Sequence, residues 1–246
     1  MKISKVFVSL IVGCFILFAT FELMGHYNIS SVFESLIVPL VAVAYFFLVK
    51  EKSIWFLFFL LFYSISDILG IFVEWIIDDY NLDEKLYFAY DYYIANLLYD
   101  LAYLCLLIEV SRFLSFSYVI KKLWIHLLVL TTLNIYLVYV LQLVSGSNLR
   151  YEFEGVFEIV YNSIVLSVLS VSLLNYFYND NKKSLYLFLG SLSIVFSEVM
   201  DIAFIYVSNN PMIYIMGSGF TLLAFYFFYQ QSEFANSADR FKILSS

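Results

Sequence analysis

The chain of 246 residues carries a formal net charge of −7, with 63% hydrophobic and only 13% charged residues, and its mean hydropathy is +0.88. Because a soluble domain contains about 25% charged residues, this composition indicates an integral membrane protein and excludes an ordinary soluble enzyme. The 13 basic residues form no stripe and are outnumbered by 20 acidic ones, so the composition also argues against a nucleic-acid partner.

A helix needs about 20 apolar residues to cross a bilayer, and the chain offers eight such segments in succession. They are expected at about 5–25, 32–49, 53–77, 86–110, 122–143, 153–178, 184–207 and 211–230. The first has basic residues before it, as a signal peptide does, but its length predicts a retained span. Pro39 is expected to interrupt the second. Short connections and the lack of an alternating pattern predict an all-α polytopic membrane helical bundle, one domain over residues 1–230 with a cytoplasmic tail at 231–246.

The basic residues divide unevenly between the two ends of this predicted bundle. Loops on the cytoplasmic side of a membrane carry an excess of Lys and Arg. Lys85 and Arg150 stand alone on one side, so the other side is expected to be cytoplasmic and to hold both termini, as in a bacterial inner membrane. The residues on that side are Lys2, Lys5, Lys50, Lys52, Arg112, Lys121, Lys122, Lys182, Lys183, Arg240 and Lys242.

Three acids lie near the middle of the predicted spans. By helical rise, Asp67 is about 18 Å from Trp55 and about 12 Å from Trp75, the aromatic residues that bracket the third span. Glu198 holds the equivalent position in the seventh span, which runs in the same direction, and Asp100 is central in the fourth. No basic residue lies at this depth. An acid without a counter-ion in a low-dielectric medium keeps its proton and can act as a general acid.

Further polar residues share helix faces with these acids. Tyr103 is three residues after Asp100, and Asp201 is three after Glu198, so each pair lies on one face. Such faces predict a shared polar cavity, although neutral acids bonded to hydroxyls and amides could instead only hold helices together. Other polar residues expected nearer the outer face are Glu22, Glu34, Glu74, Asp91, Glu158 and Asn162.

Histidine and cysteine offer no alternative chemistry. His26 and His126 are expected at opposite ends of the bundle, so no three-histidine zinc site is predicted. Cys14 and Cys105 lie within apolar spans, where packing is the simplest role. The "GSG" at 217–219 in the last span is interpreted as a helix-packing motif. The chain is therefore expected to need no metal and no cofactor, and any catalysis would fall to acids.

Five short motifs occur in order along the spans. They are "ESLIVPL" at 34–40, "FYSISD" at 62–67, "YDLAY" at 99–103, "LGSLSIVFSE" at 189–198 and "YFFYQ" at 226–230. On these motifs the chain resembles the YhhN-like family of eight-span membrane proteins, whose characterised members are lysoplasmalogenases. Asp67 stands at the acid of the second motif, whereas Asp100 replaces the family's usual His and Glu198 its usual Asp.

The resemblance implies a hydrolase that cleaves the vinyl ether bond of a lysophospholipid within the bilayer and releases a fatty aldehyde. Asp67 and Glu198, at matched depth on parallel helices, would act as acid and base, in an order that the sequence leaves open, and Asp100 would either position the water or help a neighbouring acid to keep its proton. Tyr103, Tyr226 and Gln230 would orient the substrate. Asp201 and Asn162 are added as substrate-binding residues because they lie on the same polar faces.

Two other functions stay open at the level of sequence. Intramembrane acids, together with an internal echo between "SDILGIF" at 66–72 and "SEVMDIAF" at 197–204, are typical of proton- or cation-coupled transporters. Against transport, the sixth span lacks a Pro or Gly within its central stretch to match Pro39. A non-catalytic scaffold would use the acidic loop "DDYNLDEK" at 78–85 or the tail. The sequence leaves the oligomeric state open.

Overall fold

The computed structural model describes residues 2–80, 84–145, 153–232 and 234, without the side chains of 2–4, 74, 75, 77–80 and 84–88. The expectations for Glu74 and Trp75, and most of the tail at 231–246, therefore lie outside the described residues. The elements in chain order are α1 (Lys2–Leu23), α2 (Tyr27–Ser35), α3 (Ile37–Leu48), α4 (Ile54–Tyr80), α5 (Glu84–Ser111), α6 (Phe116–Lys122), α7 (Trp124–Ser145), α8 (Glu154–Asn179), α9 (Lys182–Ile202), the π-helix η1 (Ala203–Val207) and α10 (Pro211–Ser232).

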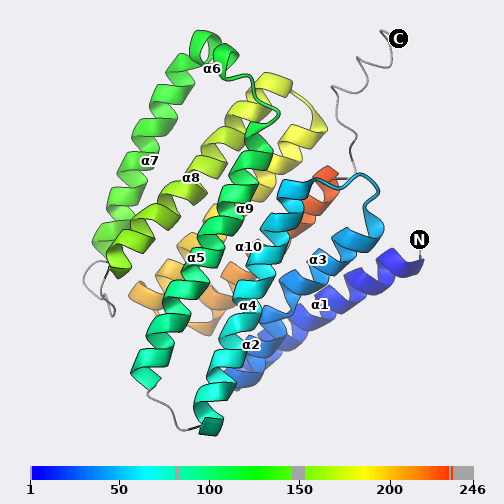
Figure 1. Ribbon diagram of the computed structural model, residues 1–246, viewed down its shortest axis with the longest axis vertical. Coiled ribbons are helices and arrows are strands. Elements are labelled where there is room, and N and C mark those ends of the chain that lie inside the picture. The colour runs from blue at the N-terminus through cyan, green and yellow to red at the C-terminus, as the bar shows by residue number, and fades with distance from the viewer. Residues whose placement is uncertain (1, 81–83, 146–152, 233, 235–246) are drawn as a thin grey trace.

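In this described part of the chain, eight helical segments are long and apolar enough to cross a membrane, and each coincides with a predicted span. The protein is thus an all-helical, multi-pass membrane protein. Long helices run side by side in alternating directions (Figure 1). The hairpins α4–α5 and α9–α10 pack most extensively, α8 lies against both α5 and α9, and α7 packs on α8 at the edge.

The second span is two helices, α2 and α3, separated at Leu36. Pro39 causes this break because proline has no backbone N–H to donate to the carbonyl of Ser35, four residues earlier. The interruption predicted from Pro39 is confirmed, three residues before the proline itself. The break lies two residues after Glu34, so this acid is in the last turn of α2.

The seventh span also departs from a regular α-helix. Its last turn, after Asp201, is the π-helix η1, in which the backbone bonds run from each residue to the one five positions earlier. This widened turn follows directly on the acids of α9. Such turns are rare and frequently occur at functional sites.

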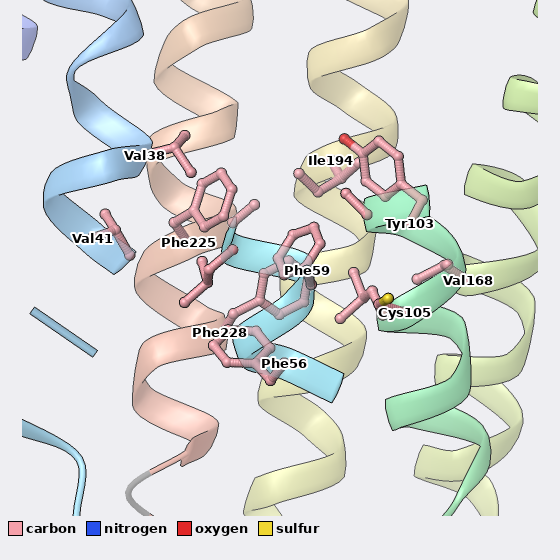
Figure 2. Close-up of a cluster of buried hydrophobic side chains, with 14 of the residues drawn as sticks. Val38, Val41, Phe56, Phe59, Tyr103, Cys105, Val168, Ile194, Phe225 and Phe228 are labelled. Carbon is pink, nitrogen blue, oxygen red and sulfur yellow. The ribbon is translucent and has the colours of Figure 1, made fainter. Parts of the chain in front are cut away.

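Aromatic side chains form a large part of a buried hydrophobic cluster (Figure 2). Phe56 and Phe59 from α4 pack against Phe225 and Phe228 from α10, and all four are at most 1% exposed. Gly190 on α9 lets α10 approach closely, because an added Cβ would lie 2.6 Å from Cδ1 of Phe228. The cluster thus ties α4, α9 and α10 together.

Candidate functional site

Asp67 points from α4 into a cavity of about 370 Å³ that is bordered by α2, α3, α5, α9 and α10. The hydroxyl of Tyr99 on α5 donates a hydrogen bond of 2.6 Å to Oδ1 of Asp67. Ser66 ties the same two helices together by donating to the carbonyl of Ala95 at 3.0 Å. These contacts position the acid at the wall of what we call the smaller acidic cavity.

Glu34 lies on the opposite wall of the smaller acidic cavity. It accepts hydrogen bonds from Tyr214 on one carboxyl oxygen and from Ser218 on the other, and both donors are on α10. The sequence placed Glu34 only near the outer face and did not assign it to the site. Its position in the motif "ESLIVPL", just before the helix-breaking proline, is the signal that could have found it.

Asp201 lines both the smaller cavity and a second one of about 830 Å³, the larger acidic cavity. It packs against α10 at Gly217, where a Cβ would lie 2.5 Å from Oδ1 of Asp201. One turn earlier, Ser197 donates to the carbonyl of Gly217 at 2.9 Å and lies 2.6 Å from the hydroxyl of Thr221. The "GSG" segment thus packs helices as predicted, and it also makes room for an acid.

Glu198 lines the larger acidic cavity but not the smaller one. The hydroxyl of Tyr161 on α8 donates to Oε1 of Glu198 at 2.5 Å, and that of Tyr103 on α5 donates to the same atom at 3.3 Å. Glu198 and Asp67 therefore lie on adjoining cavities, each held by its own tyrosines. Tyr63 stands between them, against the rings of Tyr99 and Tyr103.

The larger acidic cavity opens among α5, α7, α8, α9 and η1. Glu158 accepts hydrogen bonds from Ser145 at the end of α7 and from Tyr206 of η1, the latter at 3.0 Å. Asn162, one turn along α8, lines the cavity as well. Asp91 contributes a carboxyl whose Oδ1 has no hydrogen-bond partner in the described part of the chain.

No Lys, Arg or His is among the described residues that line these two cavities. The donors to the carboxyl groups are hydroxyls of Tyr and Ser, which leave the acids without a counter-ion. A site of this composition can exchange protons or attract a cation. It offers no positive group for a phosphate.

The structure separates the residues that the sequence proposed for the site. Asp67 and Asp201 share the smaller cavity, whereas Glu198, Asp201 and Asn162 share the larger one. Tyr103 donates a hydrogen bond to Glu198 but does not itself line either cavity. The other three proposed residues, Asp100, Tyr226 and Gln230, line neither cavity.

Two of those three have definite surroundings. Asp100 is buried at 6% exposure, and its Oδ1 has no hydrogen-bond partner among the described residues. Tyr226 is 52% exposed and lines an apolar cavity of about 350 Å³ between α1, α3 and α10. Neither side chain is placed to touch the reacting bond of a molecule bound between Asp67 and Asp201.

Metal binding finds no support in the described residues, which contain no group of three or more His, Cys, Asp or Glu placed to hold an ion. His126 packs edge-on against Phe177, and His26 against Phe21 near the other end of the bundle.

Comparison of the chain with models of protein families, with curated proteins and with solved structures gave no match. The geometry of the two acidic cavities is therefore the basis on which a function can be argued.

Proposed function

We propose that the protein is a membrane-embedded lipid hydrolase that uses carboxyl groups as acid and base, and that its substrate is a lysolipid with a vinyl ether of the lysoplasmalogen type. The observation that carries this proposal is the smaller acidic cavity. Asp67 from α4 and Asp201 from α9 line it together, with no cation among its described residues. Two acids on one cavity can divide the roles of proton donor and proton acceptor, as they do in glycosidases.

The reaction would proceed in three stages. A protonated carboxyl adds its proton to the vinyl carbon that is not bonded to oxygen, and the resulting oxocarbenium-like cation is stabilised by the carboxylate just formed and by its neighbours. Water then attacks the carbon bonded to oxygen while a carboxylate removes one of its protons, which gives a hemiacetal. The hemiacetal breaks its bond to the glycerol oxygen as a protonated carboxyl returns a proton to that oxygen and a carboxylate takes the proton of the hemiacetal hydroxyl, and a fatty aldehyde leaves.

Asp67 and Asp201 are the proposed pair because they face the same cavity, where both carboxyl oxygens of the third acid, Glu34, already accept hydrogen bonds from α10. Glu198, the partner suggested by the resemblance to YhhN-like proteins, lines the adjoining cavity, where it would contact a cationic part of the head group. The break at Leu36 lies beside the smaller cavity, and the π-helix η1 lines the larger one.

The apolar cavity offers a place for the aliphatic chain. Tyr63 lines the smaller acidic cavity and packs edge-on against Phe225, with ring centroids 5.3 Å apart. Phe225 in turn lines the apolar cavity between α1, α3 and α10. A lipid entering from the bilayer would keep its chain in the apolar cavity, and the rings of Tyr63 and Phe225 would have to separate for its ether to reach Asp67. The distribution of the basic residues separately supports an orientation in which both termini lie in the cytoplasm of a bacterial cell.

The test is release of aldehyde from a lysoplasmalogen by the purified protein, followed by mass spectrometry. Asp67→Asn and Asp201→Asn are expected to lower the rate by about 10²–10⁴-fold, the usual contribution of a general acid or base. Asp100→Asn is the matched control because it removes a buried acid that lines neither acidic cavity. A folded native sample that releases no aldehyde would remove the proposal.

A second function, proton- or cation-coupled transport, is favoured by one observation. The two acidic cavities meet at Asp201, so that acids follow one another from Glu34 to Glu158 across the polar half of the bundle. Uptake driven by a proton gradient in vesicles, abolished by Asp201→Asn, would support transport. Span six, the continuous helix α8, lacks the break that a repeat of span two would require.

A further inference from the structure

The opposite end of the bundle contains a second pair of cavities, of about 270 and 350 Å³. Both are lined by Arg112, Phe113 and Lys183, so that this trio forms the wall between them. Lys183 lies 4.9 Å above the ring of Phe113 and the Arg112 guanidinium 6.0 Å from it. Two cations are therefore held on one aromatic ring, which orients them toward both cavities.

Arg112 is fixed by a buried acid. Its Nη1 donates to Glu109 at 3.1 Å and to Ser53 at 3.3 Å, while Ser53 also donates to Glu109. The side chain of Glu109 is 4% exposed and that of Arg112 is 49% exposed. Both described hydrogen bonds of the guanidinium come from Nη1, so its other nitrogens can donate to a ligand.

Gln231 gives the second, independent indication of a ligand. It is 2% exposed, lines the smaller of these two cavities, and its Oε1 has no hydrogen-bond partner within the residues described. Because buried polar atoms are nearly always bonded, this oxygen calls for a donor that the described residues do not supply. A hydroxyl or an amine of a ligand would satisfy it.

The charges around the two cavities favour an anion. The described lining of the 350 Å³ cavity contains no carboxylate, only the two cations, amides, hydroxyls and apolar groups. The 270 Å³ cavity adds Lys52 and two acids, of which Glu109 is bonded to Arg112 and Glu51 is exposed. The balance around Arg112 and Lys183 is thus positive, in contrast to the acidic cavities.

We propose that this end of the bundle binds a phosphate ester carrying a hydroxyl or amine, supplied by the head group of an anionic lipid. The phosphate sits between Arg112 and Lys183, and the donor of the head group bonds to Oε1 of Gln231. Basic pockets between membrane helices are known to take such head groups. This site is separate from the acidic cavities and does not depend on the hydrolase proposal.

The experiment titrates detergent-solubilised protein with phosphatidylglycerol and counts bound lipids by native mass spectrometry. Lys183→Gln is expected to weaken binding about fivefold, the effect of about one basic residue near a lipid surface. Lys182→Gln is the matched control, because Lys182 is exposed in the same helical turn and lines neither cavity. An equal loss in both variants, or no binding by the native protein, would overturn the proposal.

Gln231→Met tests the hydrogen bond without removing a charge. It is expected to weaken the binding of phosphatidylglycerol, whose glycerol carries hydroxyls. The binding of phosphatidylmethanol should be unchanged, since that head group has no hydrogen-bond donor. An equal effect on the two lipids would contradict the role of Gln231. Glycerol phosphate is the soluble arm: binding as tight as that of phosphatidylglycerol would support the site and assign it to a soluble phosphate ester.

Discussion

Gly217→Ala is the sharpest test of the site geometry because the structure gives the distances. The added Cβ would lie 2.5 Å from Oδ1 of Asp201, which is 0.9 Å inside the 3.4 Å at which ordinary contact begins. It would also lie 3.3 Å from Cγ of Asp201 and 3.4 Å from Cβ of Met200. The carboxyl of Asp201 must turn away, and we expect a loss of about 1 kcal/mol in unfolding free energy, at the low end for overpacking.

Gly219→Ala is the control on the same helix. Its Cβ would meet only Phe15, at 3.6 Å, so it should gain the usual stabilisation of about 0.5–1 kcal/mol for alanine over glycine in a helix. The two variants should therefore differ by about 1.5–2 kcal/mol, which corresponds to about 3–8 °C in midpoint temperature for a chain of this size.

Thermal unfolding in detergent measures that difference, and aldehyde release measures the proposed activity. In an Asp201→Ala background the clash is gone, so Gly217→Ala should no longer destabilise, while activity stays lost. If Gly217→Ala proved as stable as Gly219→Ala and fully active, the close contact between α9 and α10 at Asp201 would be refuted.

Three further predictions concern single side chains. Gly190→Ala should lower the unfolding midpoint more than Gly217→Ala, because its Cβ meets the fully buried ring of Phe228 rather than the end of a short acid; equal midpoints would contradict this. Tyr99→Phe should lower the rate of aldehyde release by about tenfold through loss of the 2.6 Å bond that orients Asp67, with the fold unchanged by circular dichroism. Asp100→Leu should keep or raise the midpoint, since it removes a buried oxygen without a partner, and a large drop would point to a partner in the folded protein.

The eight spans could be predicted from the sequence because length and apolarity alone define a membrane helix. Each predicted span overlaps an observed one, and Pro39 correctly indicated a break in the second. The matched depth of Asp67 and Glu198 followed from counting residues along parallel helices. Tyrosine and serine partners for the acids were anticipated as a class, although not one by one.

Which acids share a cavity could not be predicted, because depth along a helix says nothing about how that helix is rotated against its neighbours. Asp67 and Asp201 line one cavity because of how α4, α9 and α10 pack, and the close approach of α9 to α10 there depends on the missing Cβ at Gly217. Glu34 reaches the same cavity from the last turn of α2, where Tyr214 and Ser218 hold it. Gln231 and its unbonded oxygen carry no sequence signal at all, since a glutamine near a helix end is ordinarily solvated.

The position of α7 at the edge of the bundle determines which substitutions this helix tolerates. No side chain between Trp124 and Val144 is buried, and within the described structure this helix packs mainly on α8 and to a lesser extent on α6. The rest of its surface is expected to face lipid. Apolar residues there should be freely interchangeable among relatives and in saturation mutagenesis. Asn134 should be the exception, because its amide exchanges hydrogen bonds of 3.0 and 3.2 Å with Ser170 of α8 and so holds the helix in register.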